Sequence, residues 1–398
     1  MDITISPSKL HGSVRAIPSK SQAHRVLICA AFAESETSIV CAETNQDIEA
    51  TVACLNALGA NITRTVNGYH VCPVHALPSS ATLPCNESGS TMRFMLPIVG
   101  ALGVDTLLTM EGRLPQRPLS PLWEEMERMG CCISRPNNST IRCQGTLRPG
   151  KYSISGSVSS QFITGLLFAM ALMNGTSQLT LTSQLESKPY VEMTQQALRI
   201  FGVNTDNYCV QGNFQFRSPK KVAIEGDWSN AAFFLTAAEL GNPISVSQLD
   251  DQSFQGDKAI RTLLKHLDSN CTISAADIPD LIPILSVAAA SKHGAKFTDI
   301  QRLRLKESDR ISAIIEMLSE FGIEAYADET TLTVLPGKFR SCTINSHNDH
   351  RIAMSAAIAA TVADGHVTIT NAQCVSKSYP AFWEDYQKLG GNYEQYIW

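Results

Sequence analysis

Six apolar stretches recur along the chain, and polar residues precede each of them. They are SKSQAHRVLICAAFA, SGSTMRFMLPIVGALG, SSQFITGLLFAMALMNG, GDWSNAAFFLTAAELG, DIPDLIPILSVAAASKHG and NDHRIAMSAAIAATVADG. Capping-type residues followed by a continuous apolar run are typical of a buried helix. Each stretch therefore predicts one buried helix with a polar N-terminus. The openings lie at Lys20, Gly89, Ser159, Asp227, Asp280 and Asp349.

A second pattern alternates with the first and consists of an amphipathic helix, a glycine and a strand. Its copies are CLNALGANITR, EEMERMGCCISR, QQALRIFGVNTD, IIEMLSEFGIEAY and WEDYQKLGGNYEQY, with a weaker copy, TLLKHLDSNCTI, that lacks the glycine. A glycine at this place closes a helix in the left-handed conformation. We expect a strand directly after each glycine, including over the last residues of QQALRIFGVNTD.

The two patterns share one spacing. The openings follow one another at steps of 69, 70, 68, 53 and 69 residues, so the chain is six copies of one unit, with the fourth shortened. Fixed self-similarity of this kind indicates a repeat architecture. We expect three units in each of two domains, with the polar helix ends facing one cleft, where substrates bind.

Cations lie in the first turns of several of these helices. Capping alone explains the Ser, Asp and Gly residues there, but not Lys20, Arg25, Arg93 and Arg351, because the helix dipole disfavours positive charge at an N-terminus. The placement predicts a bound anion between the cations.

Composition narrows the function classes. The 398 residues are 44% hydrophobic and 17% charged with a net charge of −5, which is typical of a globular protein and gives no reason to expect nucleic acid or an anionic membrane as partner. No apolar run reaches the length of a membrane span, and the first residues do not resemble a targeting segment, so a cytoplasmic location is expected. Twelve scattered cysteines without a C-x-x-C pair are interpreted as reduced, structural thiols, and no metal site is expected.

Three further segments carry clustered charge: EGRLPQRPLSPL, LRLKESDRISAIIEML and CVSKSYPAFWEDY. Taken singly, each is compatible with an ordinary surface loop or helix start. Together with the helix openings they supply many candidate anion ligands, with Asp280 and Glu307 as candidate acid/base groups. The cations are Lys20, Arg25, Arg117, Lys306, Arg310, Arg351 and Lys377. This set suits substrates that carry a phosphate and carboxylates, and neither a Walker nor a Rossmann glycine motif indicates a nucleotide.

Ten segments in order along the chain resemble the 5-enolpyruvylshikimate 3-phosphate synthase family: SKSQAHR, SGSTMR, QRPL, SSQF, SKPY, GDWSNAAFFL, DIPD, LKESDR, NDHRIAM and SKSYP. The resemblance implies an α/β fold, a two-domain inside-out α/β barrel built from six βαβαββ units, three per domain. It implies residues 1–18 with 226–398 in one domain and 19–225 in the other, with the chain crossing near 13–20 and 222–228. A monomer without a cofactor is expected.

The resemblance also implies the reaction, in which phosphoenolpyruvate and shikimate 3-phosphate give an enolpyruvyl ether and phosphate through a tetrahedral intermediate, on the route to chorismate and the aromatic amino acids. Residues matching shikimate 3-phosphate ligands are Lys20, Ser21, Arg25, Ser159, Ser160, Gln161, Ser187, Tyr190, Asp280 and Lys306. Residues matching phosphoenolpyruvate ligands are Lys20, Gly89, Arg117, Gln161, Arg310, Arg351 and Lys377. Domain closure on the substrates is expected to complete the site.

The reaction requires one group near the acceptor hydroxyl and one near the methylene carbon of the enol. Asp280 is the candidate on the hydroxyl side and Glu307 on the methylene side, with Lys20 able to shuttle protons or balance charge. The Glu87–Ser88–Gly89 sequence resembles the subgroup of the family whose response to glyphosate varies. Because Gly89 lacks a Cβ, we expect Gly89→Ala to crowd the inhibitor more than phosphoenolpyruvate.

Three alternatives belong beside this interpretation. A related transferase acts on UDP-N-acetylglucosamine, but it has a Lys-Asn pair where this chain has Lys20–Ser21, and a reactive cysteine in a loop that here (111–122) has none. An RNA-terminal phosphate cyclase would need a catalytic histidine and a basic face. His350 is present, but the net charge of −5 and the Asn-Asp-His-Arg context favour substrate anchoring. A non-catalytic repeat scaffold would have no reason to keep Lys20, Asp280, Glu307 and Arg351 together.

Overall fold

The computed structural model describes residues 1–212 and 216–396. The chain forms two compact units with separate hydrophobic cores. One unit, called the terminal unit, contains both chain ends and consists of Met1–Ile17 and Glu225–Trp398; the other, the central unit, is the continuous segment Pro18–Ile224.

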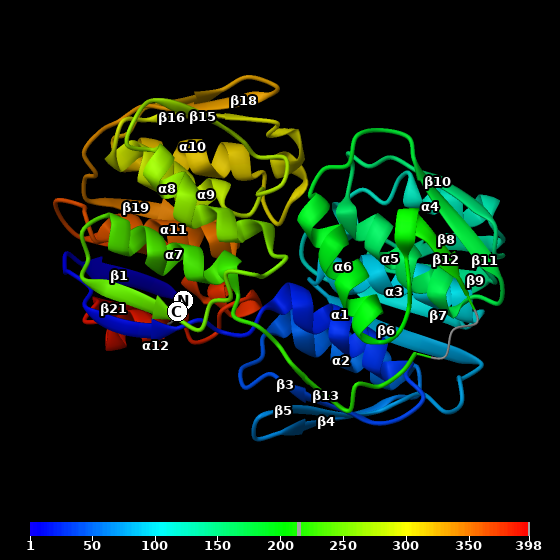
Figure 1. The fold of residues 1–398 in the computed structure, drawn as a ribbon. Helices are drawn as coiled ribbons and strands as arrows, with labels where there is room; N and C mark the ends of the chain where they lie inside the picture. The colour runs from blue at the N-terminus through cyan, green and yellow to red at the C-terminus, as the bar shows by residue number, and fades with distance from the viewer. Residues whose placement is uncertain (213–215, 397–398) are drawn as a thin grey trace. The chain divides into compact units, whose positions relative to one another are not determined.

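The central unit contains three sheets and six α-helices among its described residues (Figure 1). The sheets are β13(Lys221–Ala223)-β3(Thr37–Val40)-β5(Gly68–Cys72)-β4(Asn61–Thr65), β6(Ser80–Asn86)-β7(Asp105–Met110)-β9(Thr140–Gly145)-β8(Cys131–Asn137) and β10(Lys151–Ile154)-β11(Thr176–Leu181)-β12(Cys209–Gln211). The helices are α1(Lys20–Ala31), α2(Gln46–Ala57), α3(Gly89–Leu102), α4(Leu122–Arg128), α5(Ser160–Leu172) and α6(Lys188–Ile200), with short 3-10 turns η1(Leu114–Gln116) and η2(Asp206–Tyr208).

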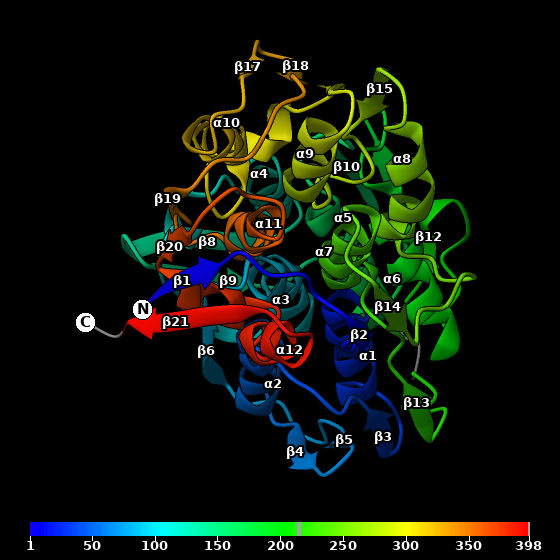
Figure 2. The ribbon, with the colours of Figure 1, turned by 90° about the vertical axis from the view of Figure 1, so that its left-hand side faces the viewer.

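The terminal unit likewise contains three sheets and six α-helices among its described residues. Its sheets are β19(Cys342–Asn345)-β20(Val367–Thr370)-β1(Asp2–Ser6)-β21(Asn392–Tyr396), β15(Cys271–Ser274)-β16(Ala295–Thr298)-β18(Thr331–Val334)-β17(Ala325–Ala327) and the two-stranded β14(Ile244–Ser247)-β2(Gly12–Arg15). Its helices are α7(Trp228–Glu239), α8(Ile260–His266), α9(Ile282–Ser291), α10(Arg310–Glu320), α11(His350–Ala360) and α12(Phe382–Lys388), with 3-10 turns η3(Gly256–Ala259), η4(Gln301–Leu305) and η5(Ala372–Lys377). Figure 2 shows β1 and β21 side by side near the chain ends, in antiparallel register from Asp2↔Tyr396 to Ser6↔Asn392.

The strands and helices follow a common order. In each sheet the first pair of strands is parallel, and in four sheets a buried helix connects the two strands of that pair: α3, α5, α9 and α11. A parallel pair needs such a crossover connection, and burial on all sides explains why these helices read as continuous apolar runs. In the terminal unit α7, α9 and α11 pack against one another and form the centre of the core (Figure 2).

The predicted helices are confirmed. The six buried helices begin at Lys20, Gly89, Ser160, Trp228, Ile282 and His350, within two residues of the predicted openings. The five glycines after the amphipathic helices all have positive φ, between 80° and 119°, as a left-handed helix end requires. The weaker copy without a glycine also forms a helix and a strand, α8 and β15.

One predicted strand is wrong. Residues 203–205, which follow the glycine of QQALRIFGVNTD, form no strand, and the chain makes the turn η2 before β12 begins at Cys209. The side chain of Asn204 accepts a hydrogen bond from the backbone N–H of Asp206 at 3.1 Å and donates to its carboxylate at 2.8 Å. Such local bonds offer the backbone an alternative to a sheet, and here the turn takes the place of the predicted strand.

Candidate active site

Arg310 is the centre of a buried ionic cluster in the terminal unit. Its side chain is 1% exposed and lies in the first turn of α10. It donates to three carboxylates: Nη1 to Asp280 Oδ1 at 2.7 Å, Nη2 to Glu307 Oε2 at 2.7 Å, and Nε to Asp349 Oδ2 at 2.9 Å. The planar guanidinium thereby fixes carboxylates from three separate segments of the chain in one place.

Asp349 connects this cluster to a second helix. Its carboxylate is fully buried and caps α11 by accepting a hydrogen bond from the backbone N–H of Arg351 at 2.9 Å. The hydroxyl of Ser308 also donates to it, at 3.0 Å. Burial would raise the pKa of Asp349, but Arg310 outweighs that effect and lowers it. Asp349 is therefore an ionised anchor that positions both arginines.

Asp280 faces the remaining cations. Its Oδ2 accepts from Arg351 Nη2 at 3.1 Å, and its Oδ1 lies 3.7 Å from Lys306 Nζ in addition to the bond from Arg310. Burial alone would raise the pKa of this carboxyl, but the three cations, Arg351 foremost, hold it well below its usual range. The side chain remains 19% exposed, so it is both strongly ionised and accessible.

Burial acts on Lys306 in the opposite direction, because a desolvated ammonium is disfavoured. It lowers the pKa of Lys306 to about 8, against the attraction of Asp280. Glu307, the next residue, is 27% exposed and has the bond to Arg310 described above. The cluster thus contains three carboxylates and three cations.

Lys377 lies at the end of η5 and is buried. Its ammonium donates to the backbone carbonyl of Asn348 at 2.9 Å. His347 and Asn348 both have positive φ, 51° and 55°, directly before Asp349. Left-handed backbone at non-glycine residues costs of order 1 kcal/mol or more each and clusters at functional sites.

In the central unit, two arginines lie at the N-terminus of α3. A Cβ at Gly89 would lie 2.5 Å from Arg117 Nη1 and 3.0 Å from Arg93 Nη1. Arg93 is buried and donates to Gln161 Oε1 at 3.1 Å, and the amide of Gln161 donates to Ser90 Oγ at 2.9 Å. Guanidinium groups and the N-terminus of a helix are both groups that can bind anions.

A second group in the central unit surrounds Arg25, which is buried in α1. Its guanidinium donates to the carbonyl of Ser21 at 2.6 Å, to the carbonyl of Tyr190 at 2.8 Å and to the hydroxyl of Thr194 at 2.9 Å. Burial lowers the pKa of Arg25 to about 10. These bonds tie the first turn of α1 to the first turn of α6, so Arg25 has a clear positioning role in the protein itself.

The serines predicted as ligands sit at helix starts. Ser159 caps α5 by accepting from Gln161 N at 3.3 Å, and Ser160 is the first residue of that helix. Ser187 precedes α6 with a positive φ of 54° and is buried. All three positions are helix N-termini; the sequence pattern predicted this at Ser159 and made no such prediction for Ser187.

Sequence reasoning missed several polar partners. Lys20 donates to Asp47 Oδ2 at 2.8 Å. A hydrogen-bonded chain runs from His24 Nδ1 to Thr51 Oγ1 (2.7 Å), on to Thr91 Oγ1 (2.7 Å) and then to the hydroxyl of Ser88 (2.7 Å), which caps α3. Burial, with the nearby Lys20, lowers the pKa of His24 well below its ordinary value and keeps the ring neutral. Apart from Ser88 and Thr91, which are three residues apart, the partners are 27 to 40 residues apart, so spacing gave no signal for them.

These contacts change one part of the sequence argument. Some of the cations at the helix starts have a carboxylate of the protein as their anion. Lys20 pairs with Asp47, Arg351 with Asp280, and Arg310 with Asp349. Helix starts with cations therefore do not by themselves prove a ligand.

The family assignment comes from comparison with known proteins. Residues 5–386 match the family model of EPSP synthase (3-phosphoshikimate 1-carboxyvinyltransferase). The chain belongs to the EPSP synthase family. A 3-phosphoshikimate 1-carboxyvinyltransferase of Clostridium novyi is 36% identical over 98% of both chains, and one of Clostridium perfringens is 38% identical over 98% of both.

The fold agrees with that assignment. A solved EPSP synthase from Acinetobacter baumannii has a TM-score of 0.80 with this chain and covers 99% of both chains at 24% identity, a likeness that concerns the fold. The chain thus has the α/β fold of several small mixed sheets that this EPSP synthase shows.

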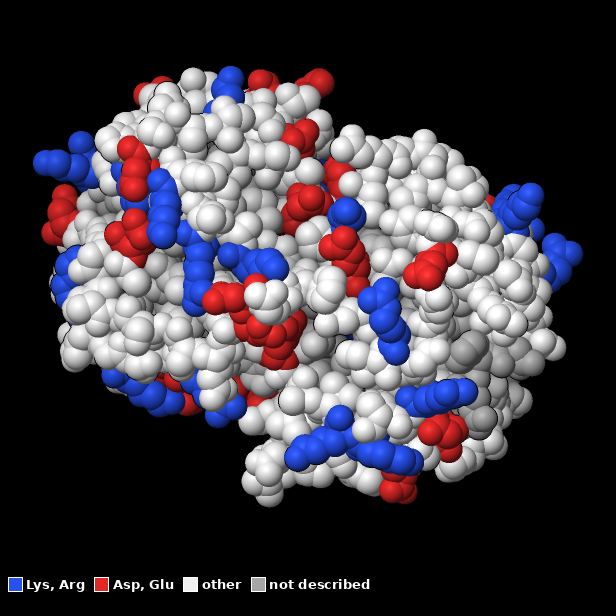
Figure 3. Space-filling view, viewed as in Figure 1, with Lys and Arg blue, Asp and Glu red and all other residues white. Residues whose placement is uncertain are grey.

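Two further features bear on the alternatives. On the visible face of each unit, Lys and Arg lie interspersed with Asp and Glu rather than gathered in one basic stripe (Figure 3), which does not favour RNA. Over the described residues, every helix is too short or too polar to cross a membrane.

Proposed function

We propose how this member of the EPSP synthase family carries out its reaction. The chain transfers the enolpyruvyl group of phosphoenolpyruvate to the 5-hydroxyl of shikimate 3-phosphate and releases phosphate, a step of aromatic amino-acid biosynthesis. The observation that carries the mechanism is the cluster of Asp280, Glu307, Lys306, Arg310 and Arg351, in which acid/base groups and anion-binding groups touch.

Asp280 is the proposed base for the acceptor hydroxyl. In the free protein three cations hold its pKa low, which makes it a weak base. Substrate phosphate and carboxylate groups would compete for Lys306, Arg310 and Arg351 and so weaken their hold on Asp280. Its pKa then rises, and the carboxylate becomes able to take the hydroxyl proton as the ether bond forms.

Glu307 is the proposed acid for the methylene carbon of the enol. It shares Arg310 with Asp280, each at 2.7 Å, so the two carboxyls are bound by the two terminal nitrogens of one guanidinium. In the addition, Glu307 gives a proton to the carbon and Asp280 takes the proton of the hydroxyl. In the elimination, the carbon returns a proton to Glu307, and the leaving phosphate oxygen takes the proton from Asp280. The cations stabilise the charge of the tetrahedral intermediate, and Lys20, balanced by Asp47, is the third catalytic candidate.

The substrate ligands expected from the sequence are proposed in the same roles. For phosphoenolpyruvate, the arginines beside Gly89 support Arg117 and Gln161, and the ionic cluster supports Arg310 and Arg351. The full set is Lys20, Gly89, Arg117, Gln161, Arg310, Arg351 and Lys377, of which Lys377 lies beside the backbone carbonyl of Asn348, next to Asp349. Shikimate 3-phosphate is assigned to residues at helix starts and to two members of the cluster. They are Lys20, Ser21, Arg25, Ser159, Ser160, Gln161, Ser187, Tyr190, Asp280 and Lys306.

The finer architecture is proposed as six repeats of a βαβαββ unit, three in each domain of an inside-out barrel. The strand order β6-α3-β7-α4-β8-β9 and its counterpart β15-α9-β16-α10-β17-β18 support it. The shortened fourth unit contains α7, β14 and α8, and its sheet is the two-stranded β14-β2 sheet. Domain closure, the monomeric state and the cytoplasmic location stay predictions.

The test measures phosphate release with both substrates and with each one alone. Release should require both, and Asp280→Asn or Glu307→Gln should each lower kcat by about 10²- to 10⁴-fold, the usual contribution of general acid–base catalysis. Glu316→Gln is the matched control, because Glu316 lies on the same helix as Arg310 but pairs with His347 instead.

Full activity in Asp280→Asn would overturn its role as the base. If UDP-N-acetylglucosamine replaced shikimate 3-phosphate as the acceptor, the acceptor assignment itself would be wrong.

A further inference from the structure

Three potential metal ligands meet on the outer surface of the central unit, in the sheet β13-β3-β5-β4. They are Glu36, His70 and Cys72, and their ligand atoms all lie within 4.8 Å of one another. It is the only such group of His, Cys, Asp and Glu within residues 1–212 and 216–396.

Strand register brings the three together. His70 and Cys72 are two residues apart on β5, so their side chains emerge on the same face, opposite the buried Tyr69 and Val71. β3 pairs antiparallel with β5 through Thr37↔Val71 and Ser38↔His70, which places Glu36, just before β3, beside Cys72.

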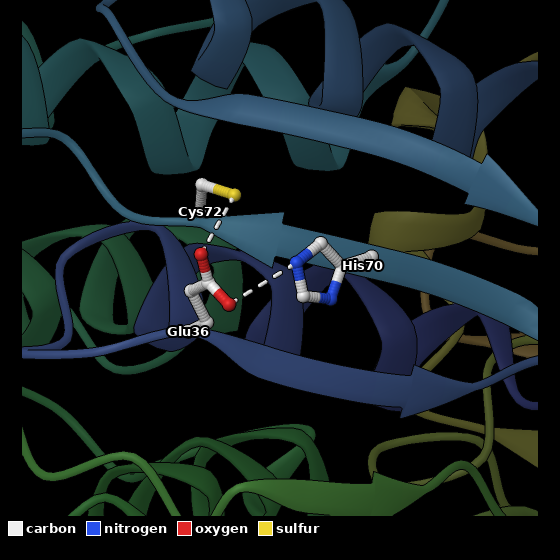
Figure 4. Close-up of side chains that lie close together, drawn as sticks. All are labelled: Glu36, His70 and Cys72. Atoms are coloured by element: carbon white, nitrogen blue, oxygen red, sulfur yellow. Dashed lines mark hydrogen bonds and ion pairs between the residues drawn. The ribbon is translucent and has the colours of Figure 1, made fainter.

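The side chains point toward one another. Figure 4 shows the Glu36 carboxylate between the thiol and the imidazole. Glu36 Oε2 lies 3.4 Å from His70 Nε2, and Glu36 Oε1 lies 3.5 Å from Cys72 Sγ. In a tetrahedral zinc site, with Zn–N and Zn–O near 2.1 Å and Zn–S near 2.3 Å, adjacent ligand atoms lie about 3.4–3.6 Å apart. The two observed contacts have this length, although they involve different oxygens of Glu36, and the three ligand atoms lie within 4.8 Å of one another, so a small movement of the side chains would bring them to the spacing of a zinc ligand set.

We propose that Glu36, His70 and Cys72 form a surface binding site for Zn²⁺, with water in the fourth position. One sulfur, one nitrogen and one oxygen ligand favour a borderline ion over Mg²⁺ or Ca²⁺, which take oxygen ligands. The thiol now donates a hydrogen bond to Glu36; on binding, its proton passes to solvent and the thiolate joins the metal. The ion would hold the start of β3 against β5.

The site stands apart from the catalytic chemistry, since none of its residues is a proposed substrate ligand. The three side chains are partly exposed, Glu36 by 64% and His70 by 39%, so an ion can enter from solvent. The absence of a recognisable metal motif in the sequence follows from the geometry: the third ligand comes from another strand, 34 residues before His70.

The test titrates the full-length protein with Zn²⁺ against a chromophoric chelator, and with Co²⁺ as a spectroscopic probe. The wild type should bind one equivalent, and Cys72→Ser, His70→Gln and Glu36→Gln should each weaken that binding at least tenfold. Cobalt should give a thiolate charge-transfer band that Cys72→Ser abolishes. Cys132→Ser is the control, because Cys132 is an exposed thiol in another sheet of the same unit.

Enzyme activity shows that each variant is folded, because none of the substituted residues touches the proposed active site. Zinc should also raise the Tm of the wild type and of Cys132→Ser, since a ligand that binds the folded state stabilises it. Equal zinc affinity in Cys72→Ser and the wild type, or a cobalt spectrum without a thiolate band, would overturn the proposal.

Discussion

Replacing Asp349 by Asn tests whether the buried ionic cluster holds the terminal unit together. The change keeps the size of the side chain and an oxygen that can cap α11. If that oxygen stays on the N–H of Arg351, the new amide NH₂ takes the place of Oδ2, where it meets the Nε of Arg310 and the hydroxyl of Ser308. The Nε–H of Arg310 then faces another donor in a fully buried position, while the Ser308 hydroxyl can turn to accept.

The magnitude follows from the contacts that survive. Removing one partner of a buried ion pair costs about 3–5 kcal/mol, because the other charge remains buried. Arg310 keeps two carboxylates at 2.7 Å, Asp280 and Glu307, and both are partly solvated. Asp349→Asn should therefore lower the free energy of unfolding by about 3 kcal/mol, the lower end of that range.

The control is Asp309→Asn. Asp309 also caps a helix, α10, and it lies next to Arg310 in the chain. Its ion pair with Arg304 is 3.4 Å long and more than a third exposed on both sides. An exposed pair contributes about 0.2–1 kcal/mol, so this variant should lose no more than that.

The assay is urea unfolding followed by tryptophan fluorescence in a Trp123→Phe background, which leaves tryptophans only in residues 225–398. The two variants should differ by at least about 2 kcal/mol near pH 7. The pKa of Asp349 is lowered in the folded state. Its contribution to the free energy of unfolding is therefore present above the ordinary pKa of an aspartate, near 4, and is lost as the pH falls through the lowered value. The gap between wild type and Asp349→Asn should therefore narrow in acid.

Equal free energies of unfolding of Asp349→Asn and Asp309→Asn at pH 7 would refute the role of the buried cluster. So would a difference in stability between the wild type and Asp349→Asn that stays constant in acid.

Two further predictions concern the substrate side. With its pKa near 8, Lys306 loses its charge as the pH rises from 7 to 9, so kcat/KM for shikimate 3-phosphate should fall over that range. The arginine of Lys306→Arg stays protonated, so this variant should show no such fall. Parallel pH profiles of kcat/KM in the two proteins would contradict this role. In Gly89→Ala the added Cβ displaces Arg117, so the KM for phosphoenolpyruvate should rise. The glyphosate inhibition constant should rise more, by about tenfold or 1.4 kcal/mol. An inhibition constant equal to that of the wild type would refute this prediction.

Much of the fold was predictable because it is local. Capping residues, apolar runs and closing glycines each act within one helix, and they located all six buried helices. The exception, the missing strand after Gly202, is also local: Asn204 forms a turn that competes with the sheet.

The candidate site was predictable only in its residue types. Arg310 and Asp349 lie 39 positions apart, and Lys20 and Asp47 lie 27 apart, so no spacing rule connects them. The same holds for Glu36, which only strand register brings to Cys72. Pairing across elements depends on the fold, and it decides which cations are already neutralised by the protein.

The strand at the very start of the chain constrains how the protein can be made. β1 lies inside its sheet, between β20 and β21, with Ile3 opposite Ile369 and Asp2 opposite Tyr396. At about 5–20 residues per second, a ribosome needs roughly 20–70 s to add the 350 or so residues between β1 and β20. The continuous segment Pro18–Ile224 can fold during that interval, while the first strand emerges early and waits without its partners. A nascent chain that stops before residue 392 leaves one edge of β1 open to other chains.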